Sequence, residues 1–239
     1  MFRRSPNSSA ICRPIVASDA LGAHVPMALL RILMNVDSLI GVFDQALRTL
    51  SGCVRSSRPS PALAPEGVSD PRQIRHVVAL MRVNHSGEVC AQALYQAQSL
   101  FSKSPRLAQV LRAAAEEEGD HLKWTADRIE ELGGRRSLLD PVWYVGAFAV
   151  GALAAKSGDA RNLGFLQETE RQVVAHLRRH LDRLPECDER TRQVLQQMAL
   201  DEGDHADLAK RMGAESLPLF ARGVMKVSAS VMTATAYRI

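Results

Sequence analysis

The sequence EGDH occurs twice in this chain, at residues 118–121 and again at residues 202–205. In each copy the glutamate and the histidine are three residues apart, so they share one face of an α-helix. The apolar residues around each copy follow a helical period and place both side chains on the face that should be buried. Because a buried carboxylate without a partner is energetically costly, the fold must supply something that compensates the charge.

Two further helical patterns carry a single glutamate on the apolar face, Glu88 in the first half of the chain and Glu170 in the second. An acidic or hydroxyl residue followed by proline, at residues 70–71 and 104–105, is typical of a helix start. No alternating pattern typical of strands is present. The sequence therefore predicts an all-α protein whose core is a four-helix bundle, with a carboxylate facing inward from every helix.

A set of carboxylates and imidazoles is a ligand set for iron or manganese, and it lacks the thiolates typical of structural zinc. Ferritin-like bundles bind two metal ions with one glutamate from each of two helices and Glu-x-x-His from each of the other two. A single Glu-x-x-His motif would more often be a surface ion pair, but two copies, each preceded by an inward glutamate at a similar interval, favour the two-metal site. The predicted ligands are Glu88, Glu118, His121, Glu170, Glu202 and His205.

Other polar residues lie near these motifs. Asp120 and Asp204 each precede a ligand histidine and are candidates to orient one. His85 and His176 lie near the faces that carry Glu88 and Glu170, and we expect a near-site role or an ordinary polar position for them. The remaining acids and histidines are interpreted as a solvated face or as having no special role: Glu116, Glu117, Glu130, His24, His76 and His180.

The chain divides into three parts. Residues 1–33 contain four arginines and one aspartate, which resembles a targeting peptide, but we favour the interpretation that translation starts at Met34. Residues 34–68 predict an amphipathic helix and a linker rich in proline and serine, and residues 69–239 hold the bundle. The net charge of +4 resides mostly in the first part, so we expect no nucleic-acid partner.

The most apolar segment, residues 141–155, is shorter than the roughly 18–20 residues that span a bilayer. It predicts either a buried helix or a helix that lies at a membrane surface. A final helical pattern, from Phe220 to Val231, has an apolar stripe with the same two interpretations. The four cysteines are far apart and form no CxxC pair, so neither a disulfide framework nor a zinc site is expected.

Four stretches, MRVNHSGEVCAQALYQAQ, EEEGDHLKW, ETERQVVAHL and DEGDHADLA, together resemble the bacterial-type demethoxyubiquinone hydroxylases of ubiquinone biosynthesis. The NHSGE motif at residues 84–88 is the most specific element, and the resemblance extends over roughly residues 60–239. All six predicted ligand positions match the family pattern. One departure is Leu177, which follows His176 where animal members have an aromatic residue, so no role of that aromatic residue is transferred.

The resemblance implies a di-iron monooxygenase with two iron ions per subunit that hydroxylates the ring of demethoxyubiquinol with O₂. It also implies a peripheral enzyme on the cytoplasmic side of the cell membrane, with residues 141–155 and 220–231 as candidate contacts. The implied partners are the membrane-resident quinol, the membrane surface, other ubiquinone-biosynthesis proteins and a second copy of the chain in a homo-oligomer. The electron donor is left open.

Two alternatives come from other functional classes. An iron-storage or iron-handling bundle needs the same metal ligands but no organic substrate. A radical-generating subunit for ribonucleotide reduction fits less well, because no tyrosine is an evident radical site. Tyr95 lies on the first core helix, whereas Tyr144 and Tyr237 lie outside the four ligand helices.

Overall fold

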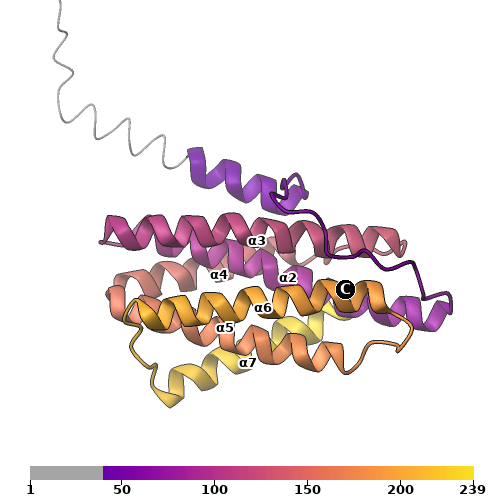
Figure 1. Ribbon diagram of the computed structural model, residues 1–239. Coiled ribbons are helices and arrows are strands. Elements are labelled where there is room, and N and C mark those ends of the chain that lie inside the picture. Colours follow the sequence, from indigo (N-terminus) through magenta and orange to yellow (C-terminus); the bar gives the residue numbers. More distant parts are fainter. Residues whose placement is uncertain (1–39) are drawn as a thin grey trace, which may run out of the picture. The chain divides into compact units, whose positions relative to one another are not determined.

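The computed structural model describes residues 40–239, and no strand occurs among them (Figure 1). The predictions for residues 1–33, for the start at Met34 and for the first turn of the amphipathic helix lie outside the described residues. A helical segment covers residues 40–51. Six longer helices follow: α2 (Pro71–Phe101), α3 (Pro105–Glu131), α4 (Asp140–Lys156), α5 (Asp159–Leu181), α6 (Glu189–Arg211) and α7 (Leu219–Ala236). The predicted all-α class is confirmed.

Side-chain caps fix the starts of three core helices. The Asp70 carboxylate accepts hydrogen bonds from the first backbone N–H groups of α2, and Ser104 Oγ accepts one from Leu107 at the start of α3. Asp188 caps α6 in the same way, by accepting from the backbone N–H of Thr191. These caps satisfy donors that have no partner within the helix, and those of α2 and α3 lie where the sequence predicts the helix starts.

The core is a four-helix bundle made of two helical hairpins, in which α2 packs against α3 and α5 packs against α6. Contacts of α3 with α6 and of α2 with α5 close the bundle (Figure 1). Helix α4 joins the two hairpins and lies mainly along α2, and α7 lies against α2 and α5. The result is consistent with the predicted ferritin-like bundle flanked by two additional helices.

Two apolar layers fill the bundle and leave a polar layer between them. Each ligand helix contributes to both layers, with its predicted metal ligands at an intermediate position. One layer is centred on Met81, Trp124, Leu177, Leu195 and Met198, and the other on Tyr95, Leu111, Leu163, Leu166 and Ala209. The apolar stripes of the four helices therefore explain the packing, and the acids interrupt them at one level.

The flanking helices expose apolar side chains. On α4, Val145 and Leu153 are each 68% exposed, and on α7 Phe220 is 82% exposed. Only Ala236 of α7 is buried. The sequence left open whether these segments are buried core helices, and for most apolar side chains of α4 and α7 that interpretation is wrong. Within the described residues, no helix combines the length and the apolar character needed to cross a membrane.

The segment of residues 53–69, which we call the strap, is the predicted proline- and serine-rich linker. It follows the helical segment 40–51, whose Gln45 bonds to Gln92 of α2. Along the strap, Arg58 pairs with side chains of α3 and α6, and Glu66 pairs with the buried Arg128 of α3. Between these two places, the backbone N–H groups of Leu63 and Ala64 donate to Gln193 of α6, so the strap is attached to the bundle along its length.

Candidate metal centre

The polar layer between the two apolar layers brings together residues from three helices. Ligand atoms of Glu88 on α2, Glu118 and His121 on α3, and Glu202 on α6 all lie within 4.8 Å of one another, and all four residues are buried. Their positions follow from the helical period, because each residue occupies the stripe that also carries core side chains. This arrangement has the size and the chemistry of a metal site.

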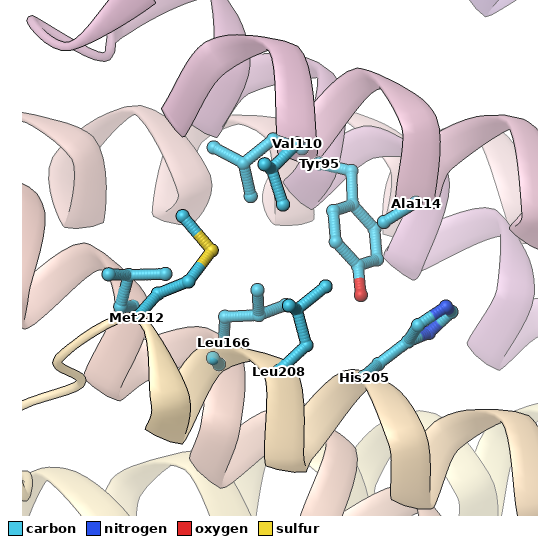
Figure 2. A pocket seen from close by; sticks show the side chains of 10 residues that line it. Tyr95, Val110, Ala114, Leu166, His205, Leu208 and Met212 are labelled. Carbon is cyan, nitrogen blue, oxygen red and sulfur yellow. The ribbon is translucent and has the colours of Figure 1, made fainter. Parts of the chain in front are cut away.

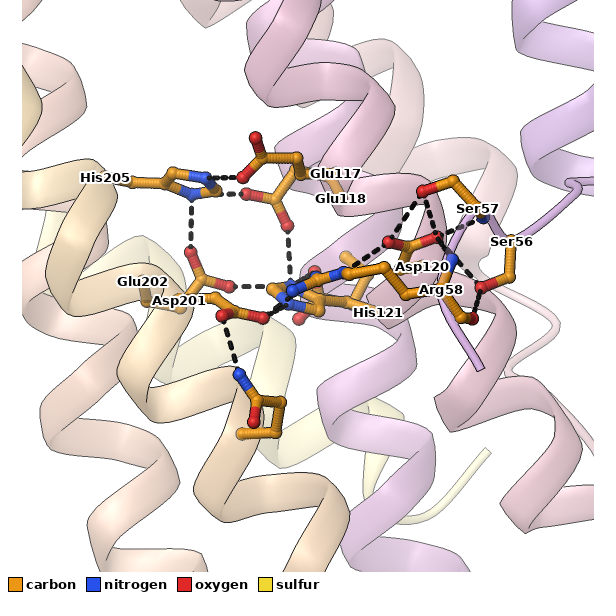
Figure 3. Close-up of polar contacts among 12 residues, drawn as sticks. Ser56, Ser57, Arg58, Glu117, Glu118, Asp120, His121, Asp201, Glu202 and His205 are labelled. Atoms are coloured by element: carbon orange, nitrogen blue, oxygen red, sulfur yellow. Dashed lines mark hydrogen bonds and ion pairs between the residues drawn. The ribbon is translucent and has the colours of Figure 1, made fainter. Parts of the chain in front are cut away.

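The two histidines point the same ring atom into this cluster (Figure 3). His121 Nδ1 lies 3.0 Å from Glu118 Oε2 and 3.1 Å from Glu202 Oε1. His205 Nδ1 lies 3.2 Å from Glu118 Oε1 and 3.3 Å from Glu202 Oε2. Glu118 and Glu202 therefore each lie between the two imidazoles, as expected of carboxylates that serve two ions.

Glu170 on α5 enters the layer beside these residues. It is buried, and its Oε1 accepts a hydrogen bond of 2.8 Å from the hydroxyl of Tyr95 on α2. Burial, and then the nearby carboxylates of Glu202 and Glu118, raise the pKa of Glu170 well above its usual range. No role at the metal site was predicted for Tyr95, and the structure makes it the direct partner of a predicted ligand.

The electrostatics of the layer show what a cation would compensate. Burial raises the pKa of Glu88 well above its usual range, and Glu88 Oε2 has no hydrogen-bond partner. Burial would do the same to Glu118, but hydrogen bonds from His121 and His205 outweigh it and lower its pKa. Burial opposes protonation of His205, yet Glu118 and Glu202 raise its pKa to about 12. Without metal, imidazole protons neutralise the carboxylates, and bound metal ions would displace those protons.

The outward ring nitrogens bond to acids that the sequence did not single out. His121 Nε2 lies 2.9 Å from Asp201 Oδ2 on α6, and His205 Nε2 lies 3.0 Å from Glu117 Oε2 on α3. Each of these acids directly precedes the glutamate of an EGDH motif. Such partners fix the orientation of a ligand histidine and determine which nitrogen faces the metal.

The predictions for the neighbouring acids therefore need correction. Asp204 is exposed on α6, and Asp120 is buried but bonds to strap residues instead of to a histidine. Glu117 is exposed, as predicted for a solvated face, but it is also the partner of His205. The useful signal was the acid before EGDH, present in both copies. It was missed because an acid adjacent to the ligand glutamate points to a different side of its own helix.

The NHSGE motif distributes its residues among different neighbours. Asn84 Oδ1 lies 2.9 Å from His180 Nδ1 on α5, and Ser86 Oγ donates to Asp140 at the start of α4. His85 Nδ1 lies 3.1 Å from Thr125 Oγ1, away from the metal-ligand cluster. The motif thus links α2 to α3, α4 and α5 around the one residue that faces the centre, Glu88.

His176 lies beside His180, with ring centroids 3.9 Å apart. Its Nε2 is buried without a hydrogen-bond partner, and burial together with Arg179 and Arg183 lowers its pKa to about 4. His176 therefore packs against another histidine, whereas His121 and His205 each contact the ligand carboxylates. A near-site role for His176 stays a prediction.

A small cavity of about 10 Å³ borders the polar layer beside Tyr95 and His205 (Figure 2). Tyr95 and His205 form its polar edge, and apolar side chains of α3, α5 and α6 form the rest, including Leu166, Leu208 and Met212. This volume is room for about one water-sized molecule. No residue of the strap lines this cavity.

Comparison with known proteins agrees with this geometry. A family model described as "Ubiquinone biosynthesis protein COQ7" matches residues 75–236. A curated 3-demethoxyubiquinol 3-hydroxylase of Cupriavidus metallidurans is 55% identical over 207 residues, which cover 85% of this chain and 100% of the relative. The proteins of the same description from Aromatoleum aromaticum and Dechloromonas aromatica are 54% and 53% identical, and each is covered completely. The matched range includes every predicted ligand.

Proposed function

The chain belongs to the COQ7 family of ubiquinone biosynthesis proteins, and from this premise we infer that it is a 3-demethoxyubiquinol 3-hydroxylase. The observation that carries this inference is the buried layer of glutamates and histidines, which lies wholly inside the matched range. The reaction is the hydroxylation of the quinol ring with O₂. The curated relatives support this function over the iron-storage alternative.

The cofactor of this proposal is a pair of iron ions. The fit rests on the donor set, since oxygen and imidazole donors suit iron and the buried Glu88 oxygen lacks a partner. Two ferrous ions bound there would supply the redox chemistry that O₂ activation requires. Glu118 and Glu202 would hold both ions, while Glu88 and Glu170 complete the carboxylate set. His121 and His205 would bind through Nδ1, the atom that faces the cluster.

The side chains around the ligands support this role in three ways. Tyr95 holds Glu170 by its hydroxyl, and Asp201 and Glu117 hold the two imidazole rings. The apolar layers on either side exclude bulk water from the polar layer. The small cavity beside His205 has mainly apolar walls and room for no more than about one water-sized molecule. A dry, prearranged site strengthens electrostatic interactions with the reacting groups.

We also propose that the protein binds the cytoplasmic face of the cell membrane peripherally. The isoprenoid quinol resides in the bilayer, so the enzyme must receive its ring from lipid. Exposed apolar side chains of α4 and α7 would contact the membrane, and both helices lie against the α2–α5 side of the bundle. Contacts with other ubiquinone-biosynthesis proteins and a homo-oligomer belong to the same proposal.

The test is a quinone profile, measured by mass spectrometry of lipid extracts from a strain in which the gene is deleted. We expect demethoxyubiquinone to accumulate and ubiquinone to disappear. The wild-type gene and a Glu116→Ala control, which changes an exposed acid on α3, should both restore ubiquinone. Glu202→Ala should not restore it, because the variant lacks an inward-facing carboxylate. Restoration by Glu202→Ala would refute the assigned site.

A separate measurement distinguishes the hydroxylase from an iron-storage bundle. With a chemical reductant added to supply the two electrons that reduce the second oxygen atom of O₂ to water, the purified iron-loaded protein should consume O₂ in proportion to added demethoxyubiquinol and should form hydroxylated quinol in the same proportion. A storage protein would instead consume O₂ in proportion to added ferrous iron, sediment as a large cage and leave the quinol unchanged.

A further inference from the structure

The strap places one arginine across the two helices that carry the EGDH motifs (Figure 3). Arg58 Nε donates to Asp120 Oδ2 on α3 at 2.6 Å, and Arg58 Nη2 donates to Asp201 Oδ2 on α6 at 2.9 Å. The guanidinium carbon also lies 4.9 Å from the centre of the Trp124 ring. The backbone N–H groups of Ser57 and Arg58 bond to Asp120 as well, so the position of the arginine is fixed by several contacts.

Asp201 is the connection between this arginine and the centre. Its carboxylate receives hydrogen bonds from Arg58, from Gln197 Nε2 at 2.8 Å and from His121 Nε2. Its side chain is only 12% exposed. A carboxylate held by two other donors has little freedom to rotate away from the histidine. The chain Arg58–Asp201–His121 therefore leads from the strap to a predicted metal ligand.

The other histidine has a weaker support. Glu117, which bonds to His205 Nε2, has a side chain that is 55% exposed. Within residues 40–239, no arginine or lysine forms an ion pair with Glu117. An exposed glutamate with one partner samples several rotamers, and water competes with the histidine for its carboxylate. The two halves of the centre thus have the same ligand types but unequal outer support.

We propose that Arg58 is a positioning residue that makes the two metal positions unequal, so that metal binds more tightly on the His121 side than on the His205 side. The physical reason is that a ligand histidine loses less conformational freedom on binding when its other nitrogen is already held. Substitution of such outer partners changes metal affinity by roughly 10–100-fold. This inference rests on the proposed metal centre, and it makes the strap part of that centre.

The experiment is a titration of the metal-free full-length protein with Co²⁺, followed by calorimetry and by the visible absorption of bound cobalt. We expect two binding steps of unequal affinity in the wild type. Arg58→Ala should weaken the tighter step about 10–100-fold and leave the weaker step unchanged. Glu117→Gln should weaken only the weaker step, and by a smaller factor, because Glu117 holds His205 less firmly. Arg58→Lys should restore part of the loss, because a lysine keeps the positive charge but lacks the planar guanidinium, whose separate nitrogens bond to Asp120 and Asp201.

The matched control is Glu66→Gln, which weakens another attachment of the strap, the ion pair with Arg128, at a residue that does not contact Asp201. It should leave both steps unchanged. If the wild type binds no Co²⁺, the metal centre itself is wrong. If the wild type binds two ions but Arg58→Ala binds them as the wild type does, or weakens both steps equally, the role of Arg58 is refuted while the centre stands.

Discussion

Each ligand histidine is held by an acid from the opposite helix. Asp201 of α6 serves His121 of α3, and Glu117 of α3 serves His205 of α6. The residue that begins each DEGDH or EEGDH stretch therefore supports the histidine of the other copy. Neither histidine is oriented until α3 and α6 are paired, so assembly of the bundle and of the site are one event.

At the same scale, Tyr95→Phe tests the partner of Glu170. The substitution removes the hydroxyl and leaves a buried oxygen of Glu170 without its donor. We expect the free energy of unfolding of the metal-free protein to fall by about 1–3 kcal/mol, the usual cost of an unsatisfied buried group. Urea denaturation measures this, and the deficit should shrink when metal occupies the site. An equal deficit with and without metal would contradict the link to the ligand.

His180 predicts a pH dependence of stability. Burial, followed by the nearby His176 and arginines, lowers the pKa of His180 to about 2. Below pH 6.5 the unfolded chain therefore takes up a proton that the folded chain does not. Its contribution to stability is complete above pH 6.5 and is lost as pH falls toward 2. Between pH 6.5 and 5, we expect the loss to be about 2 kcal/mol.

To isolate the contribution of His180 to the free energy of unfolding, wild type is compared with His180→Gln by denaturant unfolding at several pH values. Glutamine can still donate to Asn84 but does not titrate, so the variant should show the smaller loss on acidification. The other titrating groups contribute equally to both proteins, so their contributions cancel when the two free energies of unfolding are subtracted at each pH. Parallel pH profiles would show that His180 is not a source of acid sensitivity.

At the scale of elements, α4 packs directly against the backbone of α2 at Gly151. A Cβ at Gly151 would lie 2.8 Å from the Leu94 carbonyl oxygen, which is backbone and cannot move alone. A Cβ at Gly146, also on α4, would contact nothing within 4 Å. Only glycine at 151 lets α4 approach α2 this closely, and the approach buries Tyr144 against Val89 and Ala93.

The two glycines predict opposite effects of the same substitution. Gly151→Ala should lower the free energy of unfolding by about 1–3 kcal/mol, because the helices must separate. Gly146→Ala should raise it by about 0.5–1 kcal/mol, because alanine favours the helix and meets no neighbour. Thermal or urea unfolding of both variants measures the difference. A stabilising Gly151→Ala would mean that the α2–α4 contact is looser than the structure has it.

The strap is the element whose role the sequence described least well. Its prolines and serines are typical of a linker, yet its polar groups satisfy buried acids of α3 and α6. Glu66 pairs with Arg128, a fully buried arginine that also bonds to Asp188 and Thr191. A segment without regular structure can thus be ordered when its hydrogen bonds are made with the bundle.

For the whole molecule, the bundle has two unlike sides. The α2–α5 side carries α4 and α7 with their exposed apolar residues, and the α3–α6 side carries the strap. The metal-ligand layer lies between them. On our proposal the first side contacts lipid and admits the quinol, while the second side holds the ligand histidines. Substrate access and metal support are then assigned to different faces.

The membrane face predicts a pair of matched variants. Leu153→Glu on α4 should weaken binding to phosphatidylglycerol and phosphatidylethanolamine vesicles, because it places a charge among residues that would contact lipid. Leu200→Glu on α6 changes a side chain that is similarly exposed, 65% against 68%, but on another face. It should bind vesicles as the wild type does. Co-sedimentation with vesicles measures both, and equal loss in the two variants would refute the assigned face.

The sequence by itself determined the all-α class, the starts of α2 and α3 and the inward-facing positions of the six predicted ligands, because helical periodicity and caps are local properties. It also determined the family, through motifs that are contiguous in the chain. Their assignment as metal ligands stays a prediction that the geometry supports. Tertiary structure alone decided which acid holds which histidine, that Tyr95 bonds to Glu170, and that Arg58 reaches both EGDH helices. These contacts join residues far apart in sequence, and their geometry depends on how the helices are packed, which no local pattern encodes.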